Sequence, residues 1–427
     1  MAHSQTFESR RAWLRRSSLA AIGLLAARAS LLAETTSAPT PRHAAKQRRS
    51  LIILWLDGGP SQWETFDPHP GTPNGGPTKA IATASKGIQF ASGLARVAEH
   101  AGSLAVVRSM VSKEGDHDRG RYRMKTGFRP NPTVVHPSLG AICSCQFADD
   151  EIEIPRFVSI LGGGKFSRAG YLGESFDPLV LGDPQYPPAN VLSPVSENRE
   201  EQRLRGLAIV EEALARRAGR LQAQSVHREQ VENALAFMRS PARKAFDLDV
   251  ESARTRQDYG ENPFGRGCLA ARRLVEAGAR CVEVELGGWD LHKDNFEGCA
   301  KLVPVLDQAL AQLLFELRER DLLSSTLVLV AGEFGRTPRI NGLDGRDHWT
   351  NGFSVALAGC GIRGGQVLGA TDPAGVASPV DPVVVEDLFA SMLTALGIDP
   401  SIEHTTSAGR PIKLSDGKKL AQLLGET

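Results

Sequence analysis

An apolar run that ends in a polar turn most constrains the fold of this chain. Leu51–Leu56 reads LIILWL and is followed directly by Asp57-Gly58-Gly59-Pro60. A run of this length suits a strand better than a helix, and the lack of alternation indicates a strand buried on both faces. Strands of this kind occur mainly in sheets that helices cover on both sides.

The rest of the chain alternates between strand-like and helix-like segments. Further strands are predicted at Leu104–Val107, Phe157–Leu161, Cys281–Leu286, Thr326–Val330 and Phe353–Leu357. Helices are predicted at Gly93–His100, Cys268–Ala277, Phe296–Arg320 and Val383–Leu396. This alternation predicts an α/β fold with a mostly parallel central sheet sandwiched by helices. A stretch rich in Glu, Arg, Ala and Leu at about 198–240 predicts a helical insertion.

Composition excludes several classes of protein. Lys plus Arg total 50 and Asp plus Glu total 49, so the chain has no general attraction to nucleic acid. With 41% hydrophobic residues and a net charge of +1, it does not resemble a disordered chain. We expect no transmembrane segment in the mature chain, because it has no long uninterrupted apolar run. The six cysteines form no C-x-x-C pair, and the close spacing of Cys143 and Cys145 is weak evidence for zinc.

The first 38 residues are predicted to be a twin-arginine export signal. The pair Arg10-Arg11 precedes Trp13-Leu14 and an Ala-rich stretch that runs to Ala27, and the small residue Ala38 suits a cleavage point. We therefore expect a signal at 1–38, a polar linker at 39–50 and one domain at 51–427. The twin-arginine machinery would export the protein already folded, to the periplasm or the medium. The alternative is a basic amphipathic helix of the mature protein.

Carboxylates and imidazoles follow three of the predicted strands. These groups, with one hydroxyl, are Asp57 and Ser61, then Asp290 and His292, then Glu333 and the nearby pair Asp347-His348. Sites in open α/β sheets form outside the carboxyl ends of the strands, so these groups would meet at one rim. Mixtures of carboxylate and imidazole bind zinc, manganese or iron, whereas carboxylates alone prefer magnesium or calcium. Taken singly, each residue also suits ordinary turn and cap chemistry.

A further segment places His117 between two carboxylates, Asp116 and Asp118. Neighbouring carboxylates can fix the tautomer of an imidazole or raise its basicity. Arg121 follows four residues later and would share a face with His117 if a helix starts here. Imidazole and guanidinium would then face one anionic group. The alternative is a surface cluster of charges.

Four motifs together resemble one family of exported bacterial proteins. They are GGPSQWETFDP at Gly58–Pro68, GGWDLHKDNF at Gly287–Phe296, EFGRTP at Glu333–Pro338 and DHW at Asp347–Trp349. The family is domain-of-unknown-function family 1501, placed within the alkaline phosphatase and sulfatase superfamily. The resemblance runs from about residue 51 to the end of the chain. It implies one or two divalent metals at the strand ends and a nucleophile that attacks phosphorus or sulfur.

The resemblance also implies roles for single residues. Asp57 matches the first metal-binding Asp by position, and Asp290 and His292 fall where later ligands are expected. His348 is similarly placed to the last His ligand. The strand that normally ends in Asp-His ends here in Glu333-Phe334, which keeps the carboxylate and loses the imidazole.

The region of the nucleophile departs most from the sulfatase pattern. Sulfatases carry Cys or Ser, then Pro-Ser-Arg, then Thr-Gly five residues after the Arg, and Arg121 and Thr126-Gly127 keep that spacing. His117 stands in the place of the nucleophile, so formylglycine chemistry is not expected. The roles open to His117 are covalent nucleophile, general acid or base, and extra metal ligand. Ser61 is a second candidate nucleophile.

The sequence thus predicts a metal-dependent hydrolase of phosphate or sulfate esters that works after export. A divalent ion (zinc, manganese, magnesium or calcium) would have the candidate ligands Asp57, Asp290, His292, Glu333, Asp347 and His348. Arg121 would neutralise the anionic group of the ester, for which a sulfated or phosphorylated glycan is one candidate. The alternative is a catalytically degenerate member of the superfamily that binds glycans or proteins at the cell envelope.

Overall fold

The computed structural model describes residues 49–147, 153–186, 195–218, 231, 234–375, 377–406 and 408–426. The predicted signal, and the predicted linker up to residue 48, lie outside the described residues. The first described element, β1 (Ser50–Leu56), begins one residue before the predicted strand. All of its residues are buried, as expected of a strand that is covered on both faces.

A nine-stranded sheet forms the centre of the described part of the chain. Its strands lie in the order β12-β4-β11-β8-β1-β7-β5-β6, with β13 beside β4. Their bounds are β4 (Leu104–Val111), β5 (Phe157–Ile160), β6 (Leu179–Leu181), β7 (Cys281–Leu286), β8 (Thr326–Ala331), β11 (Asn351–Ala358), β12 (Gln366–Leu368) and β13 (Val383–Val384). Only β11 runs against its neighbours, β4 and β8. The predicted α/β class with a mostly parallel sheet is confirmed.

The central strand β1 determines where a site can form. It pairs in parallel with β7 on one side and β8 on the other, so that Leu54 lies opposite both Val284 and Val330. Three adjacent strands therefore end at the same edge of the sheet. The loops that leave this edge begin at Asp57, Gly287 and Gly332.

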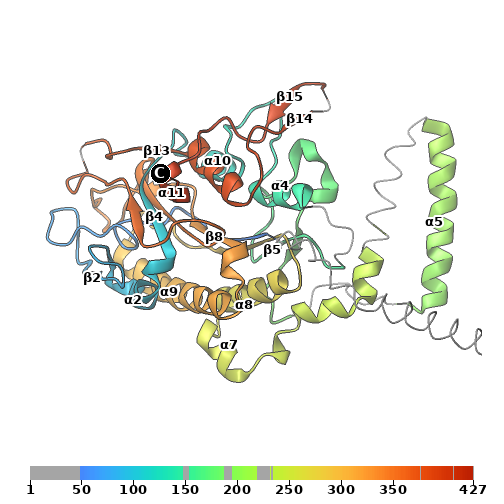
Figure 1. The fold of residues 1–427 in the computed structure, drawn as a ribbon, viewed down its shortest axis with the longest axis horizontal. Helices are drawn as coiled ribbons and strands as arrows, with labels where there is room; N and C mark the ends of the chain where they lie inside the picture. Colours follow the sequence, from blue (N-terminus) through green and yellow to red (C-terminus); the bar gives the residue numbers. More distant parts are fainter. Residues whose placement is uncertain are drawn as a thin grey trace, which may run out of the picture. The chain divides into compact units, whose positions relative to one another are not determined.

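Helices cover both faces of the sheet (Figure 1). Helices α2 (Ala95–Glu99), α8 (Pro263–Glu276) and α9 (Asn295–Glu319) pack on the face that carries Ile52 and Leu54 of β1. Helices α4 (Leu139–Gln146), α10 (Val385–Ala395) and α11 (Ala421–Leu424) pack on the face that carries Leu51 and Ile53. This arrangement agrees with alternate side chains of a strand pointing to opposite faces.

Helix α9 is long and apolar enough to cross a membrane, by its length and composition alone. Its apolar side chains nevertheless pack inside the described domain. Val303, Leu306, Leu310 and Leu317 are buried in the cluster that also holds Ile52 of the sheet. We therefore describe α9 as a core helix of this sheet.

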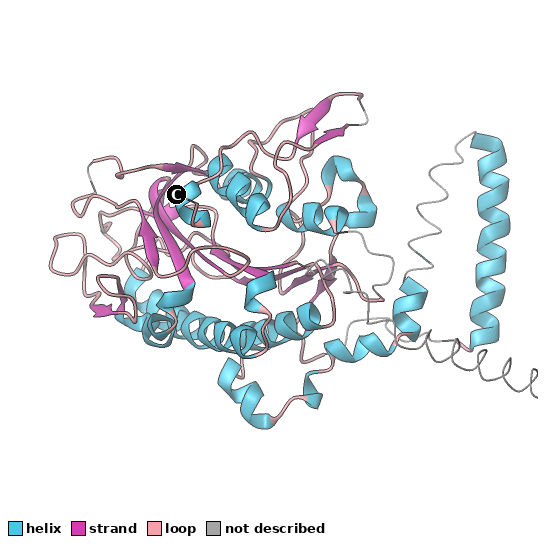
Figure 2. Cartoon of the chain, in the orientation of Figure 1, coloured by secondary structure: helices cyan, strands magenta, loops and turns pink. Residues whose placement is uncertain are grey.

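The remaining described elements are further helices and short strand pairs outside the central sheet (Figure 2). Helix α5 (Glu197–Ala218) occupies the first part of the predicted insertion, whose residues 219–230 lie outside the described ranges. Two further helices in the described residues are α3 (His117–Thr126) and α7 (Ala253–Tyr259). Short strand pairs are formed by β2 (Ala80–Ala82) with β3 (Gln89–Ala91), β9 (Gly335–Arg336) with β10 (His348–Trp349), and β14 (Glu403–Thr405) with β15 (Pro411–Lys413).

Candidate metal centre

Helix α3 brings His117 to the carboxyl edge of the sheet. The carboxylate of Asp116 caps the helix by accepting the backbone N–H of Arg119 at 3.1 Å. Gly120 permits a close approach, because a Cβ there would lie 3.1 Å from the Cβ of Glu333. His117 is the first residue of the helix and therefore lies beside the loop that follows β8.

Glu333 fixes the orientation of His117. The carboxylate is fully buried, and its Oε1 lies 2.7 Å from Nδ1 of His117 and accepts the backbone N–H of Gly58 at 3.0 Å. Because a carboxylate only accepts, Nδ1 carries the hydrogen and Nε2 of the neutral ring carries the lone pair. The hydrogen bond that His117 donates to Glu333 raises the pKa of His117, although burial opposes it.

His348 is held in the same tautomer from another loop. Strand β10 pairs with β9 so that His348 lies opposite Arg336. Nδ1 of His348 donates to the carbonyl oxygen of Gly115 at 2.7 Å, which leaves the lone pair on Nε2. Burial lowers the pKa of His348 and outweighs the opposing effect of this bond, so the ring is neutral near pH 7.

Asp290, in the loop after β7, supplies the negative charge of the centre. Its Oδ1 accepts Nη2 of Arg336 at 2.6 Å, and Arg336 is fully buried. Burial alone would raise the pKa of Asp290. The hydrogen bond and charge of Arg336, with the charges of His117 and His292, outweigh burial and lower the pKa to about 2. Asp290 is therefore ionised at neutral pH.

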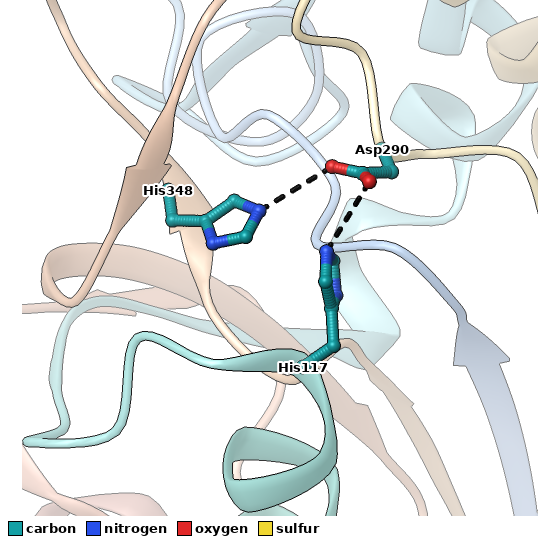
Figure 3. A group of neighbouring side chains, drawn as sticks. All are labelled: His117, Asp290 and His348. Carbon is teal, nitrogen blue, oxygen red and sulfur yellow. Dashed lines mark hydrogen bonds and ion pairs between the residues drawn. The ribbon is translucent and has the colours of Figure 1, made fainter.

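Three donor groups converge on one point, as Figure 3 shows for His117, Asp290 and His348. One ligand atom from each lies within 4.8 Å of the other two. Nε2 of His117 is buried and has no hydrogen-bond partner among the described residues, and it lies 3.3 Å from Oδ2 of Asp290. A buried lone pair without a donor is costly unless a cation or a water binds it. The donor set and the orphaned nitrogen fit a divalent metal.

His292 lies close enough to these three residues to be a fourth candidate ligand. Its Nε2 lies 3.0 Å from Nε2 of His348 and 3.1 Å from Oδ1 of Asp290. Its Nδ1 lies 2.8 Å from Oδ1 of Asp347, which must accept the hydrogen. Two imidazole lone pairs at this distance repel each other unless one ring carries a second hydrogen or both lone pairs face a cation.

Phe334 forms the apolar wall of the centre. The ring is 1% exposed, and its centroid lies 4.5 Å from that of His348 and 5.0 Å from that of His117. The residue occupies the position at which the sequence resemblance to the alkaline phosphatase and sulfatase superfamily predicts a metal-binding histidine. In this chain it packs against two imidazoles instead and limits their rotation.

Asp57 and Arg121 pair with each other beside the centre. Nε of Arg121 donates to Oδ1 of Asp57 at 2.6 Å, and Nη2 donates to Oδ2 at 2.8 Å. Nη2 also lies 3.8 Å from Oε1 of Glu333. Burial lowers the pKa of Arg121, but the hydrogen bond to Asp57 and the charges of Glu333 and Asp57 outweigh it and raise the pKa. The guanidinium is therefore a fixed positive charge next to two carboxylates.

The structure separates the sequence-predicted site residues into three groups and leaves Ser61 outside them. His117, Asp290, His292 and His348 gather at one centre. Glu333 and Asp347 instead accept the Nδ1 hydrogens of His117 and His292. Asp57 and Arg121 form an ion pair with each other. Ser61 is 1% exposed, and its hydroxyl has no hydrogen-bond partner in the described part of the chain. The ligand role of Asp57 and the nucleophile role of Ser61 stay predictions.

Two buried arginines were not predicted from the sequence. Arg336 donates to the carbonyl oxygens of Gly59 at 2.9 Å and Arg346 at 3.1 Å, and thereby joins the loops after β1 and β9 to Asp290. Arg346 in turn donates to Glu64 at 2.9 Å. The only available signal was an Arg inside the motif EFGRTP and another directly before the motif DHW. Nothing in a single sequence identifies the partner of such a residue.

The fold and the centre define an α/β protein with a candidate divalent-metal site at the carboxyl edge of its sheet. The chain belongs to the family described as Protein of unknown function (DUF1501), whose profile matches residues 48–424. This match confirms the family that the motifs indicated. A search of curated protein sequences found no match.

Similar solved structures include a sulfatase, a phosphonate monoester hydrolase and a protein in the alkaline phosphatase superfamily. The PsFucS1 sulfatase from Pseudoalteromonas sp. is 12% identical, with 83% of this chain and 69% of that chain covered at a TM-score of 0.37. The phosphonate monoester hydrolase SpPMH from Silicibacter pomeroyi is 13% identical, with 89% and 77% covered at a TM-score of 0.37. A protein in the alkaline phosphatase superfamily from Vibrio parahaemolyticus is 13% identical, with 82% and 67% covered at a TM-score of 0.35. Identities this low do not transfer an activity, so function must be argued from the side chains.

Proposed function

We propose that this protein is a metal-dependent hydrolase of phosphate or sulfate esters. One observation carries the proposal. Three imidazoles each have Nδ1 directed at an acceptor (Glu333, Asp347 or the carbonyl of Gly115), and their Nε2 atoms meet at the ionised carboxylate of Asp290. Such acceptors orient metal-ligating histidines in known metal sites.

The donor set favours some metals over others. Imidazole nitrogen suits zinc, iron and other transition metals, whereas magnesium and calcium prefer oxygen ligands. His117, His348 and Asp290 would hold the ion, with His292 as the fourth ligand. Among the four candidate ions, this mixture of imidazole and carboxylate favours zinc or manganese over magnesium and calcium. When bound, the ion supplies Lewis-acid polarisation of an ester oxygen and lowers the pKa of water.

The side chains around the centre would bind and orient the ester. Asp290 and His292 are each nearly half exposed, so an anionic group can reach the centre from their side. Phe334 closes the opposite side and excludes water there. Arg121 supplies positive charge next to Glu333 and Asp57. Since Ser61 is buried and Nε2 of His117 faces the centre, we assign the attack on phosphorus or sulfur to water.

The test is an assay of aryl phosphates, phosphodiesters, aryl sulfates and sulfated or phosphorylated glycans with added zinc, manganese, magnesium and calcium. We expect turnover with zinc or manganese and its loss in His348→Ala. The control is His100→Ala, because His100 precedes the amino end of β4, at the edge of the sheet opposite the site. Turnover that persists unchanged in His348→Ala would contradict the proposed role of the centre.

The second candidate is a protein of the envelope that binds glycans or proteins and has lost catalysis. The pairing of Arg121 with Asp57 favours it, because the guanidinium is not free to receive an anionic group. A folded, metal-loaded sample that hydrolyses none of these esters but retains a sulfated glycan on a column would support this function over the first.

We also propose that the protein is exported folded by the twin-arginine route. The support is the order of Arg10-Arg11, Trp13-Leu14 and the Ala-rich stretch, which lies outside the described residues. Replacing both arginines by lysine should leave the precursor in the cytoplasm of the producing cell. Export of the Lys-Lys variant at the normal level would refute the route.

A further inference from the structure

We infer that the centre holds a single divalent ion, and that the guanidinium of Arg121 takes the place of a second one. The inference rests on the proposed metal site and specifies its stoichiometry. It begins with the two carboxylates that do not face the centre, Asp57 and Glu333. Both lie at the ends of strands adjacent to each other, β1 and β8.

The carboxylates of Asp57 and Glu333 have the chemistry of ligands for a second divalent cation. Oxygen atoms of neighbouring Asp and Glu side chains are common ligands of divalent metals, and paired metal ions lie about 3.5–4 Å apart. In this protein a guanidinium already lies between the two. Its Nε and Nη2 engage both oxygens of Asp57 at 2.6 and 2.8 Å, and Nη2 is 3.8 Å from Oε1 of Glu333.

Further contacts fix Arg121 and Asp57 in this arrangement. Oδ1 of Asp57 also accepts the indole N–H of Trp55 at 3.1 Å, so each of its oxygens has a donor. The remaining nitrogen of Arg121, Nη1, donates to Asp118 at 3.3 Å. A guanidinium that is bound bidentately on one side and anchored on another is a rigid cation, unlike a lysine on a flexible stem.

The charge of the whole centre agrees with one ion. Its ionised carboxylates are Asp57, Asp290, Glu333 and Asp347. Asp118 is paired with Lys165 at 2.8 Å, and Glu285 has a pKa raised to about 7, so neither adds a full negative charge. Two guanidiniums, Arg121 and Arg336, offset half of that charge, and the imidazoles are neutral when they bind a metal. The two negative charges that remain match one divalent ion. A second ion would add an uncompensated double charge beside two guanidiniums.

The position of Phe334 also supports a single ion. The residue follows Glu333 directly and places an apolar ring against His117 and His348. It offers no lone pair on that side of Glu333. The free oxygen of Glu333, Oε2, has no hydrogen-bond partner among the described residues, but while Arg121 occupies both oxygens of Asp57 this single oxygen does not make a metal site.

Metal stoichiometry tests the inference. Zinc-loaded and manganese-loaded protein, freed of excess metal, is analysed for ions per chain, and the manganese form is measured by electron paramagnetic resonance. We expect one ion per chain and the spectrum of an isolated ion. Two ions per chain, or the spectrum of a coupled pair, would overturn the inference, and so would no bound ion. Because the wild-type protein alone decides this, no variant has to fold.

Variants of Arg121 test the role of the guanidinium. Arg121→Ala should raise the stoichiometry to two, because Asp57 then loses its guanidinium partner and can bind a cation together with the unpaired Oε2 of Glu333. Arg121→Lys keeps a positive charge and should hold one ion. Asp57→Asn added to Arg121→Ala should return the count to one. A folded Arg121→Ala protein that still binds one ion would overturn the claim that the guanidinium replaces a metal. Failure of ester hydrolysis would leave these counts unchanged, so the two proposals can fail separately.

Discussion

A carboxyl group on the floor of the site should make the stability of the protein depend on pH. Glu285 belongs to β7, and its backbone lies in register with Trp55 of β1. Burial, and the nearby charge of Asp57, raise its pKa from the ordinary 4.5 to about 7. Gly162 leaves room for this carboxyl, because a Cβ there would lie 2.8 Å from Oε2 of Glu285.

The proton bound to Glu285 determines whether the free energy of unfolding rises or falls with pH. Between pH 4.5 and about 7 the folded protein keeps a proton on Glu285 that the unfolded chain has lost, so the free energy of unfolding falls as pH rises. The contribution of Glu285 to the free energy of unfolding is complete below its pKa in the unfolded chain, 4.5. It is lost as the pH rises through its pKa in the folded protein, about 7. The full difference in pKa would be worth about 3 kcal/mol, and partial exposure of the group reduces this to about 2 kcal/mol.

Glu285→Gln should remove this dependence. Relative to the wild type, the variant should gain about 2 kcal/mol at pH 8 and little at pH 5, or a few degrees in Tm. The measurement is urea unfolding of the metal-free protein at both pH values. The control is Glu297→Gln, an exposed glutamate of α9 whose pKa its partner Lys301 lowers. Parallel pH profiles for the wild type and Glu285→Gln would refute the reasoning.

Three further predictions concern the metal. Glu333→Gln should weaken metal binding by roughly 10–100-fold in a chelator competition, because the carboxylate that orients His117 is lost; unchanged affinity would show that this bond does not matter. Metal affinity should be weaker at pH 6 than at pH 8, because the raised pKa of His117 lets a proton compete for the ring, and a flat profile would exclude His117 as a ligand. Metal at about 100 times its dissociation constant should stabilise the protein by about 2.7 kcal/mol over the chelated form, as a shift in Tm would report, and no shift would argue against a bound ion.

The sequence predicted the edge of the sheet at which the candidate site lies, because that edge follows from the direction of the strands. An apolar run such as Leu51–Leu56 indicates a buried strand, and parallel strands bring their carboxyl ends to one edge. Asp290 and His348 meet for this reason, although they are 58 residues apart. His117 also reached the centre, as one of the alternatives that its flanking carboxylates left open.

The sequence could not predict which charged groups pair with one another. Asp57 and Glu333 follow their strands as expected, yet one binds Arg121 and the other binds His117. Such pairing depends on how close α3 comes to the sheet, which the small residue Gly120 permits. No local pattern of residues carries that information.

Two features of the sheet, its short strands and the direction of β11, could not be predicted from the sequence. Strands β6, β12 and β13 were not predicted, because two or three residues show no periodicity, and Val383–Val384 was assigned to the start of a helix. The antiparallel direction of β11 could not be read from its apolar residues, since buried strands of either direction look alike.

The most direct test of the metal centre is anomalous diffraction from crystals of the zinc-loaded protein. We predict one strong peak within about 2.0–2.2 Å of Nε2 of His117, Nε2 of His348 and a carboxylate oxygen of Asp290. Data above and below the zinc absorption edge would identify the element. A peak bound by other residues, or no peak in a crystal soaked with zinc, would contradict the proposal that these side chains form a metal site.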